Sequence, residues 1–414
     1  MSTFFKNTEL AIRYNISEAT VRNWIRSSKE GKLKLELIES RARSYVANSI
    51  SNIALIDTLV QQNRKYRNTN AIKTVSPTDE LLRVFDNKQV HDIVRNLELH
   101  REIPRQYGYF AEAAGEWDEY INKQMAAEVP SVVRSCGELL DANFGYIDQR
   151  TAKYKKINLI DVGVGNGVPV RRLISHLRGT GKLGRYVALD FSEDMLNITK
   201  RHMKEWFGDD FSFEGHQFDM TQNRFTSILT KGDAIDEPET INLVLLLGAT
   251  PNNLRIPEDA FRNVCESMAP HDLLVYTDRV ETTVEPPEWF RHSYEEAPKK
   301  FELLGRHRFV LDRLGITESF YDARVGFDVK GRRKYACAKL KFALNLKLDL
   351  GGKEKIVQFE KGDNILVWQC WRWTSSKLID ILESCGFYVA HLSQTEDRYV
   401  VVVAEITPNH HVSL

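Results

Sequence analysis

One segment constrains the fold of this 414-residue chain more than any other. It reads Ile157-Asn-Leu-Ile-Asp161-Val-Gly163-Val-Gly165-Asn-Gly167, an apolar strand that ends in an acid and leads through a glycine loop into a helical pattern. Glycine lets the backbone pass close to a ligand where a Cβ would clash. The N-terminus of a helix adds unpaired N–H groups and partial positive charge. The segment therefore predicts a strand–loop–helix unit whose loop contacts a ligand.

The alternation of strands and helices continues beyond this loop. Further strands are predicted at 186–190, 241–247 and 273–276, with helices at 170–177 and from Ser192 onward. Such alternation is typical of a doubly wound, mostly parallel sheet. We therefore expect an α/β, Rossmann-like domain.

Composition excludes several classes of protein. The chain is 42% hydrophobic and 28% charged, as in soluble globular proteins, and its 57 basic residues equal its 57 acidic ones. This balance excludes a uniformly basic nucleic-acid coat protein. The chain has no apolar run of the roughly 18–20 residues that span a bilayer, and its start has no apolar signal-peptide core, so we expect a cytoplasmic protein.

The cysteines and histidines do not predict a metal site. The five cysteines are scattered and form no C-x-x-C pair, which predicts reduced, mostly buried thiols in place of a disulfide framework or structural zinc. The histidines lack ligand spacing, so we expect no bound metal.

The G-x-G-x-G loop after Asp161 differs from the dinucleotide fingerprint G-x-G-x-x-G. It resembles motif I of the Rossmann-like S-adenosylmethionine (SAM) methyltransferases. Asp190 and Asp219 follow in that family's order, and the resemblance implies that they contact the ribose hydroxyls and the adenine. The alternative is that both acids cap helices. The cofactor residues implied by the resemblance are Asp161, Gly163, Gly165, Gly167, Asp190, Ser192, Asp219 and Gly248.

A narrower resemblance begins after the third strand. The run 247–254, LGATPNNL, is similar to the G-S-T-I-G-N segment of the histidine Nα-methyltransferases of ergothioneine biosynthesis. Short blocks between about residues 95 and 405 resemble other segments of that family in the same order, among them 315–320, GITESF. The resemblance implies a SAM-dependent methyltransferase with an additional α+β substrate subdomain.

The departures from that family bear on the substrate. Asn253 matches the family asparagine that holds the amino-acid end of the substrate. A family tyrosine of that site falls on Val310, and the E-x-S that reads the imidazole ring falls on Trp368-Gln-Cys370. An indole and a thiol cannot replace a carboxylate and a hydroxyl in reading imidazole. We therefore predict that histidine is not the acceptor, and that Asn253, Trp368 and Cys370 contact another amino-acid-like amine.

Three residues are candidates to position this acceptor, namely Tyr109, Asn253 and Glu318. SAM carries its own leaving group, so the protein must mainly align the acceptor with the methyl group. Trp368, Trp371 and Trp373 favour a larger or more aromatic acceptor, unless they pack in a core or an interface.

The start of the chain has a different character. Residues 1–67 contain twelve Lys or Arg and six Asp or Glu, which indicates a separate unit with its own partner. Residues 8–26 resemble an all-α helix-turn-helix of the excisionase or MerR type, with Ser17 capping the second helix. The apolar contacts between its helices are expected from Leu10, Ala11, Ile16, Val21, Trp24 and Ile25.

This unit is a candidate to bind duplex DNA. The exposed face of its second helix would present Thr20, Arg22, Asn23 and Arg26 to a major groove. The alternative is a docking or dimerisation domain without DNA contact. Residues 46–66 have helical apolar spacing and are a candidate homodimer surface.

The expected organisation has five parts, a helix-turn-helix unit at 1–67, a linker at 68–79, helices at 80–150, the SAM-binding domain at 151–290, and a substrate subdomain with C-terminal strands at 291–414. A small-molecule methyltransferase is the favoured function. A SAM-responsive transcription regulator is the alternative. A nucleic-acid methyltransferase ranks third, because 250–253, TPNN, lacks the second proline and the aromatic residue of [DNS]-P-P-[YFW], and 285–289, EPPEW, follows a later strand.

Overall fold

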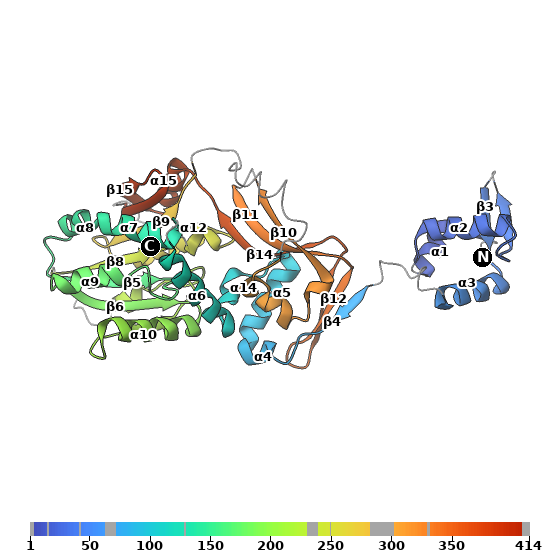
Figure 1. Ribbon diagram of the computed structural model, residues 1–414, viewed down its shortest axis with the longest axis horizontal. Helices are drawn as coiled ribbons and strands as arrows, with labels where there is room; N and C mark the ends of the chain where they lie inside the picture. Colours follow the sequence, from blue (N-terminus) through green and yellow to red (C-terminus); the bar gives the residue numbers. More distant parts are fainter. Residues whose placement is uncertain are drawn as a thin grey trace. The chain divides into compact units, whose positions relative to one another are not determined.

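The computed structural model describes residues 4–14, 16–40, 43–62, 72–127, 130–229, 239–248, 250–281, 302–328 and 332–407 (Figure 1). The run 285–289 lies outside the described residues. The chain divides into two compact units, which the contacts define as 1–77 with 314–322 and 339–364, and 78–313 with 323–338 and 365–414.

A seven-stranded sheet forms the centre of the second unit. Its strands are β5 (Lys156–Val162), β6 (Leu183–Asp190), β7 (Glu214–Gln217), β8 (Thr240–Leu246), β9 (Leu273–Arg279), β15 (Phe387–Gln394) and β16 (Tyr399–Ile406). The order is β15-β16-β9-β8-β5-β6-β7. The last five strands in this order pair in parallel, whereas β16 is antiparallel to β9 and β15. The predicted α/β sheet is confirmed. The predicted end of the SAM-binding domain at residue 290 is wrong, because β16 belongs to this sheet. Its run Val400–Ala404 is wholly buried there.

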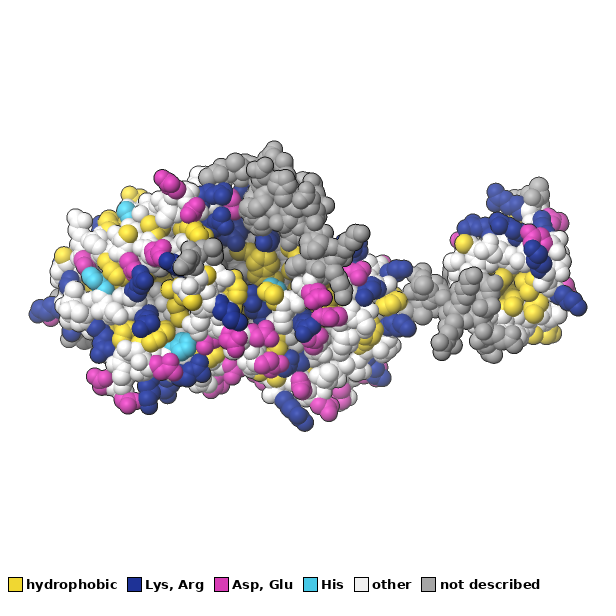
Figure 2. Space-filling model, viewed as in Figure 1, with side chains coloured by type: hydrophobic (Ala, Val, Ile, Leu, Met, Phe, Trp, Pro, Cys, Tyr) yellow, Lys and Arg dark blue, Asp and Glu magenta, His cyan; other side chains and the backbone are white. Residues whose placement is uncertain are grey.

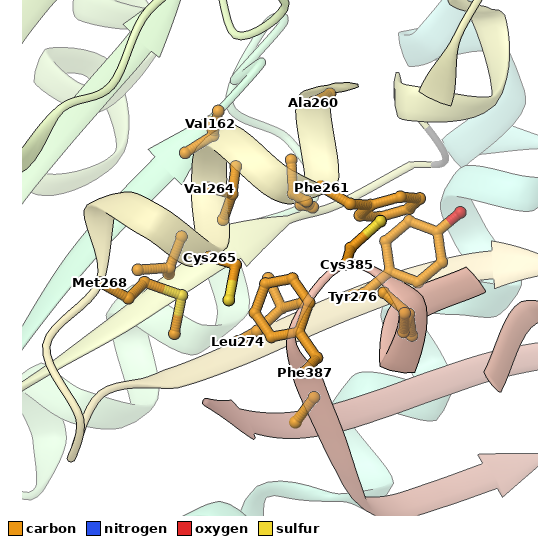
Figure 3. Close-up of a cluster of buried hydrophobic side chains, with 14 of the residues drawn as sticks. Val162, Ala260, Phe261, Val264, Cys265, Met268, Leu274, Tyr276, Cys385 and Phe387 are labelled. Carbon is orange, nitrogen blue, oxygen red and sulfur yellow. The ribbon is translucent and has the colours of Figure 1, made fainter. Parts of the chain in front are cut away.

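Helices cover both faces of the sheet. They include α7 (Val132–Ala142), α8 (Phe144–Arg150), α9 (Arg171–Gly179), α10 (Glu193–Phe207), α12 (Pro257–Ser267) and α15 (Ser375–Ser384). Alternate side chains of a strand point to opposite faces. On β8, Leu243 therefore packs in the cluster with α9 and α10, and Val244 packs in the cluster with α12 and α15. Figure 3 shows the second cluster, where the rings of Phe261 and Tyr276 meet edge to face at 5.4 Å.

The region 80–150 is helical, as predicted. It contains α4 (Leu81–Val84), α5 (Asn87–His100), the 3-10 helix η2 (Arg105–Tyr109), α6 (Glu112–Ala126), α7 and α8. Phe85 is 1% exposed and contacts the rings of Tyr107, Phe110 and Phe309, the last of which belongs to α14 (Gly305–Arg313). This aromatic cluster holds η2 in place.

A second, three-stranded sheet has the order β10-β11-β14. Its strands are β10 (Tyr321–Asp328), β11 (Arg333–Leu340) and β14 (Asn364–Trp371). These strands lie within 291–414, the range for which the sequence predicts a substrate subdomain with C-terminal strands.

The predicted linker at 68–79 is wrong in part. Lys73–Val75 forms β4, which pairs in parallel with β12 (Leu344–Asp349), and β12 pairs with β13 (Glu354–Phe359). Val75 is buried. Because burial of its apolar side chain is favourable, residues 73–75 form a strand and not a solvated linker.

The start of the first unit contains α1 (Asn7–Arg13), α2 (Glu18–Lys29) and α3 (Ile50–Gln62), with strands β1 (Phe4–Phe5), β2 (Leu37–Ser40) and β3 (Arg43–Ala47). The three strands form a sheet, so the all-α expectation is wrong. The six predicted apolar contacts are all buried, and Ser17 caps α2 by accepting the Thr20 amide at 3.1 Å. The helix expected from residue 46 begins at Ile50, because Val46 and Ala47 pair in β3.

All five cysteines are buried and free, as predicted. No helix in the part of the chain that the structure describes is long and apolar enough to cross a membrane.

Candidate active site

A cavity of about 640 Å³ opens in the second unit where β5, β6 and β8 end. The carboxyl ends of parallel strands meet at one edge of the sheet, which is the usual ligand site of such folds. Nine of the residues that the sequence predicts line this cavity: Tyr109, Gly163, Gly165, Asp190, Asp219, Gly248, Asn253, Trp368 and Cys370. Figure 2 shows a hollow with hydrophobic side chains on this unit and Lys and Arg side chains beside it.

Asp190 ends β6 and joins two loops. Its Oδ2 accepts the Gly165 amide at 3.0 Å, and its Oδ1 accepts the Ser192 amide at 3.0 Å. Burial raises the pKa of this carboxyl to about 6, against the lowering effect of the amide hydrogen bonds. Each carboxylate oxygen keeps a further lone pair. Asp190 can therefore accept two more hydrogen bonds from a diol.

The glycine loop is fixed from behind. The Thr199 hydroxyl donates to the Gly165 carbonyl at 2.7 Å, and the Asn166 amide donates to Asp118 Oδ1 at 2.8 Å. Gly163 and Gly165 have φ of +71° and +58°, which other residues rarely adopt. The loop is thus held in a shape that glycine alone adopts readily.

Gly248 marks open space in the same cavity. Its φ is +82°, its amide donates to the Thr277 hydroxyl at 2.9 Å, and a Cβ built on it would have no atom within 4 Å. The absent side chain leaves room for a ligand beside the end of β8.

Three other predicted cofactor residues lie behind the cavity wall. Asp161 is 3% exposed and accepts the Tyr186 hydroxyl at 3.2 Å, and burial raises the pKa of its carboxyl to about 7. Ser192 caps α10, and its hydroxyl donates to the Tyr109 carbonyl at 2.5 Å. A Cβ on Gly167 would lie 2.8 Å from Met203 Cε. These positions support the loop from within the fold.

Asp219 after β7 and the asparagines Asn252 and Asn253 after β8 have different surroundings. Asp219 Oδ1 accepts the amide and the hydroxyl of Thr221 at 2.8 and 2.6 Å. Asn253 lines the cavity from the 3-10 helix η3 (Thr250–Asn253). Its neighbour Asn252 is fully buried and bonds Asp278 and Tyr276, so the two adjacent asparagines face different surroundings.

Cations and aromatic rings form the wall near Tyr109. The Arg105 guanidinium lies 4.3 Å from the Tyr109 ring centroid, and Arg306 lies 4.5 Å from that of Tyr120. Burial, followed by the charge of Arg105, lowers the pKa of Arg306. Sequence reasoning missed both arginines, because nothing in their local pattern separates them from surface residues.

The strand β14 contributes one face to the cavity. Trp368, Cys370 and the following Arg372 alternate along the chain, and all three line the cavity. Burial raises the pKa of the Cys370 thiol, which keeps it protonated. Lys334 of β11 lies 5.8 Å from the Trp368 ring centroid. The two-residue spacing from Trp368 was a signal that could have found Arg372.

The other two tryptophans and Glu318 are not among the residues that line the cavity. The Trp371 indole donates to the Leu254 carbonyl at 2.8 Å, and Trp373 is 4% exposed in the hydrophobic core. Glu318 is exposed in the 3-10 helix η4 (Glu318–Phe320) of the first unit. Its neighbours Leu314 and Ile316 are buried.

A family model described as histidine-specific methyltransferase, SAM-dependent, matches residues 92–405. The chain belongs to this family. It is a SAM-dependent methyltransferase, and the residues of the cavity fit SAM. The Asp190 carboxylate has lone pairs for a ribose diol, and Gly248 leaves open space beside it.

Solved structures also match this member of the family. One is a SAM-dependent methyltransferase from Clostridium acetobutylicum ATCC 824 (9% identity, 71% of this chain, 98% of that chain, TM-score 0.39). Others are the PH0226 protein from Pyrococcus horikoshii OT3 (12%, 70%, 99%, 0.39) and magnesium protoporphyrin IX methyltransferase from Synechocystis PCC 6803 with bound SAH (9%, 77%, 100%, 0.37). No curated protein matches the chain.

Proposed function

We propose that this family member transfers a methyl group to an amine nitrogen of a small amino-acid-like compound other than histidine. One observation carries the proposal. Trp368 and Cys370 line the same cavity as Asp190 and Asn253, and they stand where the resemblance places the family's imidazole-reading carboxylate and hydroxyl. An indole and a protonated thiol do not reproduce those hydrogen bonds, and a buried mismatch of this kind strongly disfavours a substrate.

The cofactor supplies an electrophilic methyl group on a sulfonium leaving group. The chain's own part is to bind and orient. The Asp190 carboxylate accepts hydroxyl hydrogen bonds, and the loop from Gly163 to Gly165 gives backbone access. Asp219 keeps Oδ2 without a partner among the described residues, so it can accept a further donor.

The acceptor nitrogen must be neutral to attack. Five cationic side chains line the cavity, and nearby positive charge disfavours a protonated amine, which lowers its pKa. The Asn253 carboxamide and the Tyr109 hydroxyl can hold the amine in line with the methyl group. The cavity thus favours a reactive amine without a dedicated base.

Methyl-labelled SAM tests the acceptor class. The purified full-length chain is incubated with an extract of the producing cells, and the products are separated into small-molecule, protein and nucleic-acid fractions. We expect label among small molecules and none on added histidine above background. Label in nucleic acid, or histidine methylation at ordinary turnover, would overturn the proposal. SAM binding without any transfer would favour the regulator.

Matched variants make this test specific. Asp190→Ala removes the predicted ribose acceptor, and Glu193→Ala removes an exposed acid three residues later in α10. Label should fall with the first variant and persist with the second.

A second function is proposed for residues 1–67, which we infer bind duplex DNA. The observation that favours it is the outer face of α2, where Arg22, Asn23 and Arg26 are exposed while Val21 and Trp24 are buried. Thr20 is partly committed, because its hydroxyl contacts that of Ser17 at 2.9 Å. Exposed Arg and Asn on one helix are the donors that read base edges and phosphates.

Fluorescence anisotropy with a mixed-sequence duplex tests this second proposal. The full chain should bind at 50 mM salt and weaken steeply by 200 mM, as counterion release requires. The double variant Arg22→Gln/Arg26→Gln should bind about tenfold or more weakly. Lys353→Gln/Lys361→Gln removes two exposed charges elsewhere and should bind normally. Equal binding by both double variants, or no binding at low salt, would refute DNA recognition by α2.

A further inference from the structure

Charged side chains of both signs line the cavity. Two of its three carboxylates, Asp190 at the end of β6 and Asp219 after β7, lie at the cofactor end. The third, Glu302, is exposed. Three of the five cations of the cavity lie close together, because the charges of Arg372 and Arg279 act on Lys334. Arg279 ends β9, Lys334 belongs to β11 and Arg372 follows β14, whereas Arg105 and Arg306 lie beside the rings of Tyr109 and Tyr120. In the sheet order, β5 and β8 separate β9 from β6 and β7. The acceptor end is therefore basic.

The chain places these cations by strand geometry. Lys334 and Ala336 alternate on β11, as Trp368, Cys370 and Arg372 alternate along β14 and beyond, and side chains two apart share a face. All of them line the cavity. On the main sheet, Arg279 pairs in register with Tyr399 and lies 5.5 Å from its ring centroid.

The nearby carboxylates Asp278 and Glu281 also bond other groups. Against the effect of burial, the charges of Cys370, Asp278 and Glu281 raise the pKa of Arg372. Asp278 accepts the Asn252 amide at 2.5 Å, the Tyr276 hydroxyl at 3.1 Å and the Arg279 amide at 2.6 Å. Glu281 pairs with Arg398 at 2.9 Å. Among the described residues, neither Arg279 nor Arg372 forms an ion pair with a carboxylate within 4 Å, and Arg279 Nε is buried without a hydrogen-bond partner.

The cations also repel one another. Burial lowers the pKa of Lys334, and the charges of Arg372 and Arg279 lower it further, against an opposite effect of Cys370. Like charges this close repel one another, and a bound anion relieves that repulsion. Guanidinium groups match carboxylate and phosphate geometry in particular.

We propose that the acceptor carries an oxyanion, a carboxylate or a phosphate, which binds between Arg279, Lys334 and Arg372 at the end away from the methylated nitrogen. This inference rests on the proposed function of the cavity. The acceptor of this chain would then carry an anionic group where the family's substrate has a neutral ring. Trp368 lies beside Lys334 and packs against the connecting part of the acceptor.

Anion binding to the full chain tests the proposal without turnover. The protein is saturated with S-adenosylhomocysteine, whose binding is measured by calorimetry. Inorganic phosphate and succinate are then each titrated against chloride at constant ionic strength, and the melting temperature and the dissociation constant are recorded. We expect phosphate or succinate to bind and to raise the melting temperature. The preferred anion tells a phosphate acceptor from a carboxylate acceptor.

Variants locate the anion. Lys334→Gln and Arg279→Gln should each weaken its binding about tenfold, as loss of a charge-assisted hydrogen bond requires. Lys339→Gln, exposed on the same strand as Lys334, should bind the anion as the parent does. Two site variants are made so that the test still holds if one of them misfolds. Binding of S-adenosylhomocysteine shows that a variant has folded.

The outcomes separate the two proposals. If S-adenosylhomocysteine does not bind, the proposed function fails, and this inference fails with it. If it binds but neither anion exceeds chloride, or if all three variants respond alike, the basic acceptor site is refuted and the proposed methyltransferase function stands.

Discussion

Asp190 and Gly165 are joined by a hydrogen bond in which the Gly165 amide donates to Asp190 Oδ2 at 3.0 Å. The acid at the end of β6 thus holds the glycine loop after β5. Asp190→Ala should weaken SAM binding about tenfold or more, because it removes the predicted ribose acceptor and loosens the loop. Calorimetry measures the affinity, with Glu193→Ala as control. Unchanged affinity in Asp190→Ala would show that Asp190 does not contact the ribose.

The same carboxyl predicts a pH dependence of binding. Burial raises the pKa of Asp190 to about 6, and hydroxyl donors favour the ionised form. The SAM dissociation constant should therefore rise as pH falls through about 6, by up to roughly tenfold per unit. Titrations between pH 5 and 8 measure it. A dissociation constant that stays level below pH 6 would contradict an ionised Asp190 in the complex.

Burial of Asp161 predicts a pH dependence of stability. The pKa of this carboxyl is raised from 3.8 to about 7, so the native state binds more protons than the unfolded state between these values. The free energy of unfolding should fall as pH rises through this window. Asp161→Asn lacks this proton, so the parent should lose on the order of 3 kcal/mol relative to the variant between pH 4 and 8.

Urea unfolding of both proteins at several pH values provides the measurement. A constant difference between the parent and Asp161→Asn would mean that Asp161 has the same pKa in the native and unfolded states.

Alanine substitutions at Gly167 and Gly181 distinguish the effect of steric contact from that of backbone strain. Both have positive φ, +73° and +68°. A Cβ on Gly167 would lie 2.8 Å from Met203 Cε and 2.9 Å from Thr199 Cγ2, whereas one on Gly181 would meet nothing within 4 Å. Gly167→Ala should cost about 1–3 kcal/mol more than Gly181→Ala, because overpacking adds to the conformational cost. Melting curves compare the two, and equal losses would exclude a packing role for Gly167.

Asn252 is predicted to be structural. Its amide donates to Asp278 Oδ2 at 2.5 Å and to the Trp371 carbonyl at 3.3 Å, and its Oδ1 accepts the Tyr276 hydroxyl at 2.9 Å. Asn252→Ala leaves these buried groups unsatisfied and should cost about 2–4 kcal/mol of stability. Tyr276→Phe removes fewer of the bonds and should cost less. Denaturant unfolding ranks the two, and the reverse ranking would contradict the role of Asn252 as the hub.

Local patterns predicted a large part of the site. The strand from Ile157 and the glycine loop follow from apolar runs and from glycine, which are properties of adjacent residues. The resemblance to SAM methyltransferases predicted that Asp190 and Asp219 contact the cofactor, and both line the cavity. The core of the first helices also followed from spacing, since Leu10 and Val21 are 0% exposed.

Other assignments depended on packing between distant segments. Asp161 and Gly163 are neighbours in one motif, yet only Gly163 lines the cavity, because Asp161 still belongs to a buried strand. Glu318 matched a family segment but is exposed, since the flanking apolar residues fill the interior.

By itself, the sequence determined the parallel sheet and its glycine loop, because these depend on periodicity and on local backbone freedom, and its resemblance to known methyltransferases indicated the family and the cofactor. Only the tertiary structure decided that Arg279, Lys334 and Arg372 line one cavity. Arg279 and Lys334 lie on strands of two sheets and Arg372 follows a third strand, and each is an ordinary charged residue in its own segment. Charges far apart in the chain affect one another only when packing brings their strands together.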